Sequence, residues 1–174
     1  MLDKRMEAAL NKQVNAELYS AYLYLSMAAQ FEEMGLKGFS NWMRSQTMEE
    51  EVHAIKLYNY ICERGGRVKL DPIEGPKTEW KSPLEAFEDA YAHEQKVSGL
   101  IGGLVDLSIE LKDHMTSQFL QWFVAEQVEE EASAKEIADK LELMKDAPGG
   151  LFMIDKELAA RTFIYPPPAL AGGE

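Results

Sequence analysis

The chain has 174 residues, 46% of them hydrophobic, which suits one domain over residues 1–174 with a substantial core. Its net charge of −12 and its lack of a basic tail argue against nucleic-acid binding. No apolar run reaches the roughly 18 residues of a membrane span, and the single cysteine excludes an internal disulfide, so we expect a cytoplasmic protein.

Apolar residues recur at helical spacing along five segments. They predict a bundle over about 4–145, with helices at about 4–34, 38–64, 83–112 and 113–145, and a short fifth helix at about 151–161. Ser82, Pro83 and Glu85 resemble the N-cap, first turn and capping-box acid of the third helix. Prolines exclude a helix across 66–82, and the proline-rich residues 162–174 predict a mobile tail.

The lengths of the connections predict the topology. Short turns make the first and second helices antiparallel neighbours, and likewise the third and fourth. The crossover of 17 residues can span about 55 Å when extended. It therefore exceeds the roughly 40 Å of the second helix and leaves the second and third helices parallel. The sequence predicts an all-α four-helix bundle with one long crossover and a short fifth C-terminal helix.

Each long helix carries an acid in the middle of its apolar stripe. These acids are Glu17, Glu50, Glu94 and Glu130. Glu17 lies 19 residues before the turn at Leu36 and Glu50 lies 14 residues after it, while the other two lie 18 residues on either side of Lys112. His53 shares a helix face with Glu50, and this Glu-x-x-His pair occurs in carboxylate-bridged di-iron bundles. We therefore expect four acids and one imidazole in a single layer.

Such a layer requires a counter-charge. One unpaired buried carboxylate costs several kcal/mol, and the four stripes contain no lysine or arginine. Two divalent cations would balance four carboxylates, and an oxygen-rich set with one imidazole favours iron or manganese over structural zinc. We expect iron. The non-enzymatic alternative is a helical assembly protein whose buried acids are structural.

Two further polar residues on the stripes have alternative interpretations. Tyr24, one heptad after Glu17, either takes part in the redox chemistry or is a core aromatic whose hydroxyl bonds to an acid. Gln127 either holds a water or oxygen species near a metal or is an ordinary polar residue.

A second acidic group lies one residue off the stripes and consists of Glu49, Glu126 and Glu129. It either binds a third ion and passes iron onward or is a solvated helix face, and spacing alone favours the solvated face. We expect His93 and His114 at the surface and Cys62 as a packed thiol. The fifth helix has an apolar face that predicts an interface, made by Leu151, Phe152, Ile154 and Leu158.

Over nearly its whole length the sequence resembles the non-haem ferritins of bacteria and archaea. The motifs are Asn15-Ala16-Glu17-Leu18-Tyr19-Ser20-Ala21-Tyr22-Leu23-Tyr24, Glu49-Glu50-x-x-His53, His93-Glu94, Phe119 to Glu131, and Ile154-Asp155-Lys156-Glu157-Leu158. The resemblance implies a ferritin-like fold and a ferroxidase centre. One iron would be held by Glu17, Glu50 and His53, and the second by bridging Glu50 with Glu94 and Glu130, near Gln127. A possible third iron would lie at Glu49, Glu126, Glu129 and Glu130.

The resemblance also implies a function. Fe(II) would be oxidised by dioxygen or peroxide, and ferric mineral would be stored inside a homo-oligomeric cage of about 24 subunits, with the fifth helix at a symmetry axis. We expect no haem, because Glu51 stands where a bacterioferritin has its haem-ligating methionine. A rubrerythrin-like peroxidase normally adds a Cys-x-x-Cys module, and the DNA-protecting mini-ferritins lack the fifth helix, so both fit less well.

Overall fold

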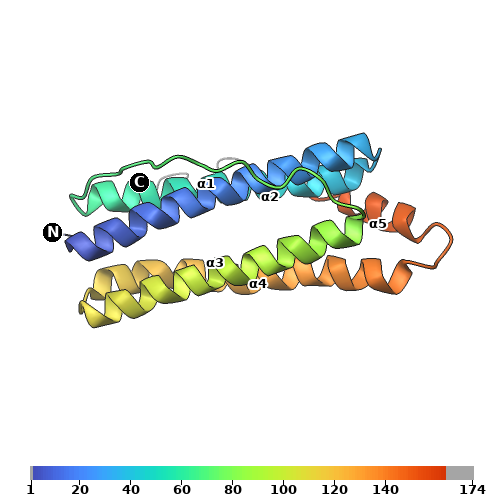
Figure 1. Ribbon diagram of the computed structural model, residues 1–174. Coiled ribbons are helices and arrows are strands. Elements are labelled where there is room, and N and C mark those ends of the chain that lie inside the picture. The colour runs from blue at the N-terminus through green and yellow to red at the C-terminus, as the bar shows by residue number, and fades with distance from the viewer. Residues whose placement is uncertain (1, 164–174) are drawn as a thin grey trace.

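A computed structural model describes residues 2–163, which form five helices and no strand. The helices are α1 (Lys4–Glu33), α2 (Lys37–Glu63), α3 (Pro83–Glu110), α4 (His114–Met144) and α5 (Gly150–Leu158). α1 and α2 form one antiparallel pair and α3 and α4 another, and the crossover returns along the first pair (Figure 1). The predicted all-α bundle with one long crossover and a fifth helix is therefore confirmed, with α2 and α3 parallel.

The ends of the helices follow from local chemistry. Ser82 Oγ accepts a hydrogen bond from Glu85 N at 3.1 Å and caps α3, as predicted. The carboxylate of Glu85 reaches one residue further back than in a standard capping box, to Lys81 N at 2.8 Å. Gly35 has φ +75° in the turn between α1 and α2, whereas the turn between α3 and α4 places Lys112 at φ +56°.

Some predicted boundaries differ from the observed ones. α5 ends at Leu158 and not near residue 161, because the chain turns there to run beside α2. Most of the tail predicted over 162–174 lies outside the described residues.

Cys62 is exposed near the end of α2, so its prediction as a packed thiol was wrong. Among the described residues, no helix is both long and apolar enough to cross a membrane.

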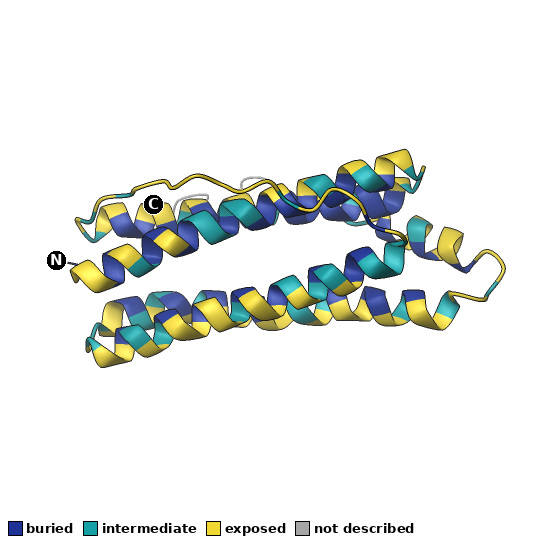
Figure 2. Ribbon diagram, in the orientation of Figure 1, coloured by how far each residue is buried: buried dark blue, intermediate teal, exposed yellow. Residues whose placement is uncertain are grey.

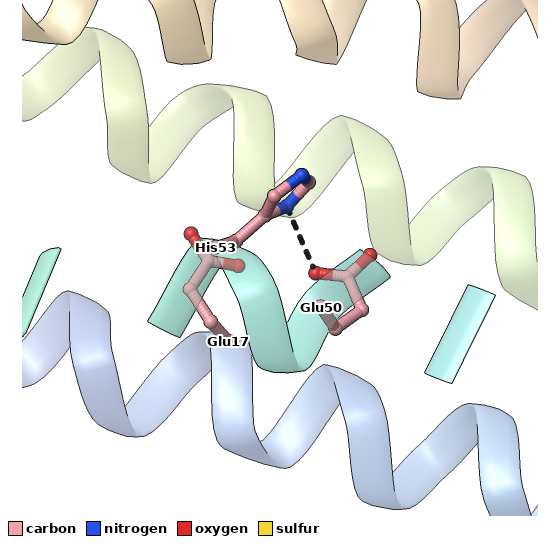
Figure 3. A group of neighbouring side chains, drawn as sticks. All are labelled: Glu17, Glu50 and His53. Atoms are coloured by element: carbon pink, nitrogen blue, oxygen red, sulfur yellow. Dashed lines mark ion pairs between the residues drawn. The ribbon is translucent and has the colours of Figure 1, made fainter. Parts of the chain in front are cut away.

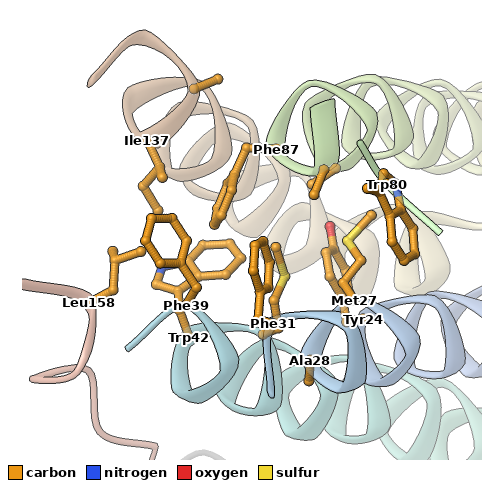
Figure 4. Close-up of a cluster of buried hydrophobic side chains, with 14 of the residues drawn as sticks. Tyr24, Met27, Ala28, Phe31, Phe39, Trp42, Trp80, Phe87, Ile137 and Leu158 are labelled. Atoms are coloured by element: carbon orange, nitrogen blue, oxygen red, sulfur yellow. The ribbon is translucent and has the colours of Figure 1, made fainter. Parts of the chain in front are cut away.

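The core consists of two apolar clusters with a polar zone between them. The buried faces of the helices point toward one another, and the exposed faces point outward (Figure 2). One cluster, at the α5 end, contains Phe31, Phe39 and Phe87 (Figure 4). The other, at the opposite end, contains Leu10, Leu57 and Leu120 among others. The two clusters shield the middle of the bundle from solvent at both ends.

α5 is fixed to the start of α2. Asp155 Oδ1 accepts hydrogen bonds from Gly38 N at 2.8 Å and Phe39 N at 3.1 Å, which caps α2 from another helix. A Cβ atom at Gly38 would lie 1.6 Å from the carbonyl oxygen of Asp155, so this approach requires glycine. Ile154 and Leu158 are buried in the cluster at this end. The predicted apolar face of α5 is thus divided, since Leu151 and Phe152 are exposed.

We expect Asp155→Ala to lower the free energy of unfolding by about 1–2 kcal/mol, because two backbone donors of α2 lose their acceptor. Denaturant titration at equal subunit concentration measures this loss. Lys156→Ala is the matched control, because Lys156 is exposed on the same helix. Equal stability of the two variants would contradict the capping role of Asp155.

Candidate metal centre

The structure brings the four predicted acids and His53 together inside the bundle. All five are buried, with exposed fractions from 1% for Glu17 to 8% for Glu130. α1 supplies Glu17, α2 supplies Glu50 and His53, α3 supplies Glu94, and α4 supplies Glu130. Within residues 2–163 no lysine or arginine forms an ion pair with any of the four acids.

An inner group is formed by Glu17, Glu50 and His53, whose candidate ligand atoms lie within 4.8 Å of one another. The side chains converge between α1 and α2 (Figure 3), and His53 Nδ1 lies 3.4 Å from Glu50 Oε2. Glu17 Oε1 accepts a hydrogen bond from Gln13 at 2.9 Å, but its buried Oε2 has no partner. A buried acceptor without a donor is well suited to a cation, so this group fits a metal ion.

An outer group is formed by His53, Glu126 and Glu130, again within 4.8 Å. The half-buried Glu126, one of the three acids of the second acidic group, therefore lies close to two residues of the centre. Glu129 is exposed on α4 and belongs to neither group, while Glu49 forms an ion pair with Arg161. Since His53 contributes to both groups, its orientation affects both.

The remaining predicted residues bond to Glu94. Tyr24 Oη donates a hydrogen bond to Glu94 Oε1, and both residues are buried. Gln127 Nε2 donates to Glu94 Oε2 at 3.2 Å and to the Glu94 carbonyl at 3.3 Å. The hydroxyl of Tyr24 thus has the acid partner that its core interpretation requires, and Gln127 holds the same carboxylate from α4.

Gln46 is a part of the centre that sequence reasoning missed. Its fully buried amide donates to Glu130 Oε2 at 2.6 Å and to Glu50 Oε1 at 3.1 Å. The side-chain oxygen of Gln46 accepts a hydrogen bond from Arg161 at 2.9 Å. Because the oxygen is held there, the NH2 group of the amide faces the two acids. Gln46 could have been found from the sequence, because it lies on the buried stripe one turn before Glu50. Arg161 could not, because it lies on none of the helical stripes.

Burial shifts the acids of the centre toward their protonated forms. It raises the pKa of Glu17 to about 8, with the charge of Glu50 adding to the shift. Burial also raises the pKa values of Glu50 and Glu130 well above their usual range, and that of Glu94 rises for the same reason. Four carboxylate charges are therefore unfavourable here unless cations compensate them.

His93 is half-buried, so its prediction as a surface histidine was wrong, whereas His114 is exposed as expected. His93 Nε2 lies 2.8 Å from Ser20 Oγ, and its ring lies edge-on to that of Tyr24 at 6.1 Å between centroids. Burial lowers the pKa of His93 to about 4, so the imidazole is neutral at pH 7. It packs behind Tyr24 as a neutral group.

Comparison with known proteins agrees with this geometry. Residues 7–144 match the family described as ferritin-like domain. A bacterial non-haem ferritin of Bacteroides fragilis is 45% identical over 161 residues, covering 92% of this chain and all of the relative. An engineered closed form of the Archaeoglobus fulgidus ferritin superposes with a TM-score of 0.93 at 54% identity, covering 94% of this chain and all of that one.

A structure of an open-pore ferritin from the same archaeon gives a TM-score of 0.92 at 54% identity, covering 93% of this chain and all of that one. The family match, the alignment with the bacterial relative and the superposition on the archaeal structure each cover most of the chain. The chain therefore belongs to the ferritin family, among the non-haem ferritins of bacteria and archaea.

Proposed function

We propose that this chain is a ferroxidase that oxidises Fe(II) and stores the ferric product as mineral inside a cytoplasmic homo-oligomeric cage, with residues 1–174 acting as one ferritin-like domain. One observation carries the proposal. Four carboxylates and one imidazole share a buried layer in which Glu17 Oε2 has no partner. Oxygen-rich sites of this kind suit iron, which is the substrate here and not a permanent cofactor.

In this proposal Glu17, Glu50 and His53 hold one Fe(II), and Glu50, Glu94 and Glu130 hold the second. Two Fe(II) ions give up two electrons to one dioxygen molecule, which takes up two protons and leaves as hydrogen peroxide. With peroxide as the oxidant, the same two electrons and two protons yield two water molecules. The protonated acids of the metal-free centre lose their protons as iron binds.

The chain's own residues orient these ligands. The rings of Trp122 and Phe123 meet His53 edge-on, at 5.4 and 6.0 Å between centroids, and restrict the imidazole. Gln46 spans Glu50 and Glu130, and Tyr24 and Gln127 bond to the two oxygens of Glu94. We propose that Tyr24 and Gln127 take part in the ferroxidase centre by holding the carboxylate of Glu94 in place.

The exposed side of α5 supports assembly. Leu151, Phe152 and Met153 are consecutive apolar residues, and Phe152 has 71% of its surface exposed. Adjacent exposed apolar side chains are typical of an interface. We propose a cage of 24 subunits, and light scattering should give a mass near 24 times the 19.7 kDa of one chain. A monomer or dimer would contradict the cage.

The ferroxidase activity is tested by mixing Fe(II) with the protein in air and recording ferric absorbance. We expect the signal to rise faster than in buffer alone and the iron to elute with the protein. A helical assembly protein with structural acids would leave the oxidation at its rate in buffer.

The proposed third iron, at Glu49, Glu126, Glu129 and Glu130, gives a separate prediction. We expect Glu126→Ala to reduce the number of tightly bound irons by one and to spare the first rapid oxidation, because Glu126 lies in the outer group and not in the inner one. Glu49→Ala and Glu129→Ala should act in the same direction. Anaerobic binding isotherms measure the effect, and unchanged isotherms in all three variants would make these residues a solvated helix face.

A further inference from the structure

Arg161 connects the segment after α5 with the edge of the metal centre. Its Nη2 atom pairs with Glu49 Oε2 and also donates to Gln46 Oε1 at 2.9 Å. Its Nη1 atom donates to the carbonyl oxygen of Trp42 at 3.4 Å, and the guanidinium lies 4.3 Å from the centre of the Trp42 ring. The planar guanidinium therefore makes four contacts with three residues on one face of α2.

The backbone around Arg161 is fixed to the same helix. Asn41 Nδ2 donates to the carbonyl oxygens of Arg161 at 2.8 Å and Leu158 at 3.3 Å. The Arg161 amide in turn donates to Leu158 O at 3.2 Å. The side chains of Arg161 and Glu49 keep only 22% and 25% of their surfaces exposed, so this ion pair is largely shielded from water.

The contacts of Arg161 reach the metal ligands by two routes. One route runs through Gln46, whose amide nitrogen donates hydrogen bonds to both Glu50 and Glu130 and so orients both carboxylates. Glu49 belongs to the acids of the proposed third iron, and its Oε2 atom is bonded to Arg161. Glu49 is not one of the three residues of the outer group, but the proposed third iron site adds it to Glu126 and Glu130. A cation that recruits Glu49 to that site would therefore compete with the guanidinium for it.

We propose that Arg161 is a positioning residue that holds Glu49 in the metal-free protein and releases it when a divalent cation binds at the outer group and recruits Glu49 as a further ligand. This rests on the proposed function in that the outer group binds metal. Competition is reciprocal, so a cation at the outer group weakens the attachment of residues 159–163 to α2. Binding of metal and docking of the C-terminal segment are then coupled through one carboxylate.

The first test is anaerobic calorimetric titration with Zn²⁺, which binds carboxylate and imidazole but is redox-inert. We expect Arg161→Gln to tighten the outer binding step by at least about tenfold, the effect of losing one charge-assisted contact. Arg161→Lys keeps the charge but not the planar guanidinium, so its outer step should lie between those of the wild type and Arg161→Gln. Adding Arg161→Gln to Glu49→Gln should change little, because the carboxylate for which the two cations compete is then absent.

The second test uses the wild-type protein alone and so does not depend on the folding of any variant. Saturating Zn²⁺ should increase hydrogen exchange at the amides of residues 159–161, whose backbone bonds close the turn after α5. The same zinc concentration should leave this exchange unchanged in Glu49→Gln.

The outcomes separate this inference from the proposed function. Tight inner binding of Zn²⁺, together with an outer step that is unchanged or weaker in Arg161→Gln, would overturn only the role of Arg161. Unchanged exchange at residues 159–161 on zinc saturation of the wild type would also overturn it. If the wild type binds no Zn²⁺ tightly at all, the proposed metal centre fails and this inference fails with it.

Discussion

Glu50→Ala should lower the initial rate of Fe(II) oxidation by at least about a hundredfold, a larger loss than is typical for a residue that only supports a metal ligand. Glu50 lies 3.4 Å from His53 Nδ1 and is bonded to Gln46, which also bonds to Glu130. In the proposed centre Glu50 is the carboxylate that serves both irons. Stopped-flow absorbance on the assembled protein measures the rate.

Two further variants make this result specific. His53→Ala should cause a comparable loss, because His53 belongs to both the inner and the outer group. Glu51→Ala is the matched control, since Glu51 is the exposed neighbour of Glu50 on the same helix, and its rate should equal that of the wild type. Wild-type rates in both Glu50→Ala and His53→Ala would refute the proposed centre.

The metal-free protein should lose stability as the pH rises from about 4.5 to about 8. Burial raises the pKa of Glu17 from 4.5 to about 8, so over this range the folded protein holds a proton that the unfolded chain has released. Stability falls with pH wherever the folded state binds more protons. At about 1.4 kcal/mol per pKa unit, Glu17 alone accounts for up to roughly 5 kcal/mol. The raised pKa values of Glu50 and Glu130 act with the same sign, whereas the lowered pKa of His93 acts with the opposite sign below about pH 6.5.

Glu17→Gln should flatten this dependence and make the metal-free protein more stable than wild type at pH 8, because the amide carries no charge to bury. Denaturant titration with chelator present, at pH 5.5, 7 and 8, measures the slope. Glu33→Gln is the control, as Glu33 is exposed on the same helix and should leave the slope unchanged. A wild-type stability that is constant or rises over this range would contradict the buried, metal-free acid layer.

The regular part of the molecule could be predicted because helix geometry leaves few alternatives. Positions three and four residues apart share a face, so the stripes fixed the inward direction of Glu17, Glu50, Glu94 and Glu130. Similar distances from the turns, 14 to 19 residues, then placed them at a similar height. The same rule explains the division of the second acidic group. Glu126 lies one turn before Glu130 and joins it, whereas Glu129 is rotated by about 100° and is exposed.

The remaining features depend on contacts between segments with no common period. Arg161 reaches Glu49 and Gln46 only because Asp155 fixes α5 against the start of α2. No residue spacing in the sequence predicts that Arg161 lies close to α2. His93 lies one residue from the stripe of α3 and was predicted at the surface, yet α1 covers it through Ser20 and Tyr19. Packing between helices determined these positions.

In the proposed function, the buried acids hold two Fe(II) ions per subunit for oxidation. Anaerobic Fe(II) titration of the metal-free protein, with free and bound iron separated by equilibrium dialysis, tests it most directly. We expect at least two tightly bound Fe(II) ions per subunit, with binding that releases protons and weakens as the pH falls below the raised pKa of Glu17, about 8. Saturation at fewer than two tightly bound Fe(II) ions per subunit, or affinity independent of pH, would contradict a di-iron centre.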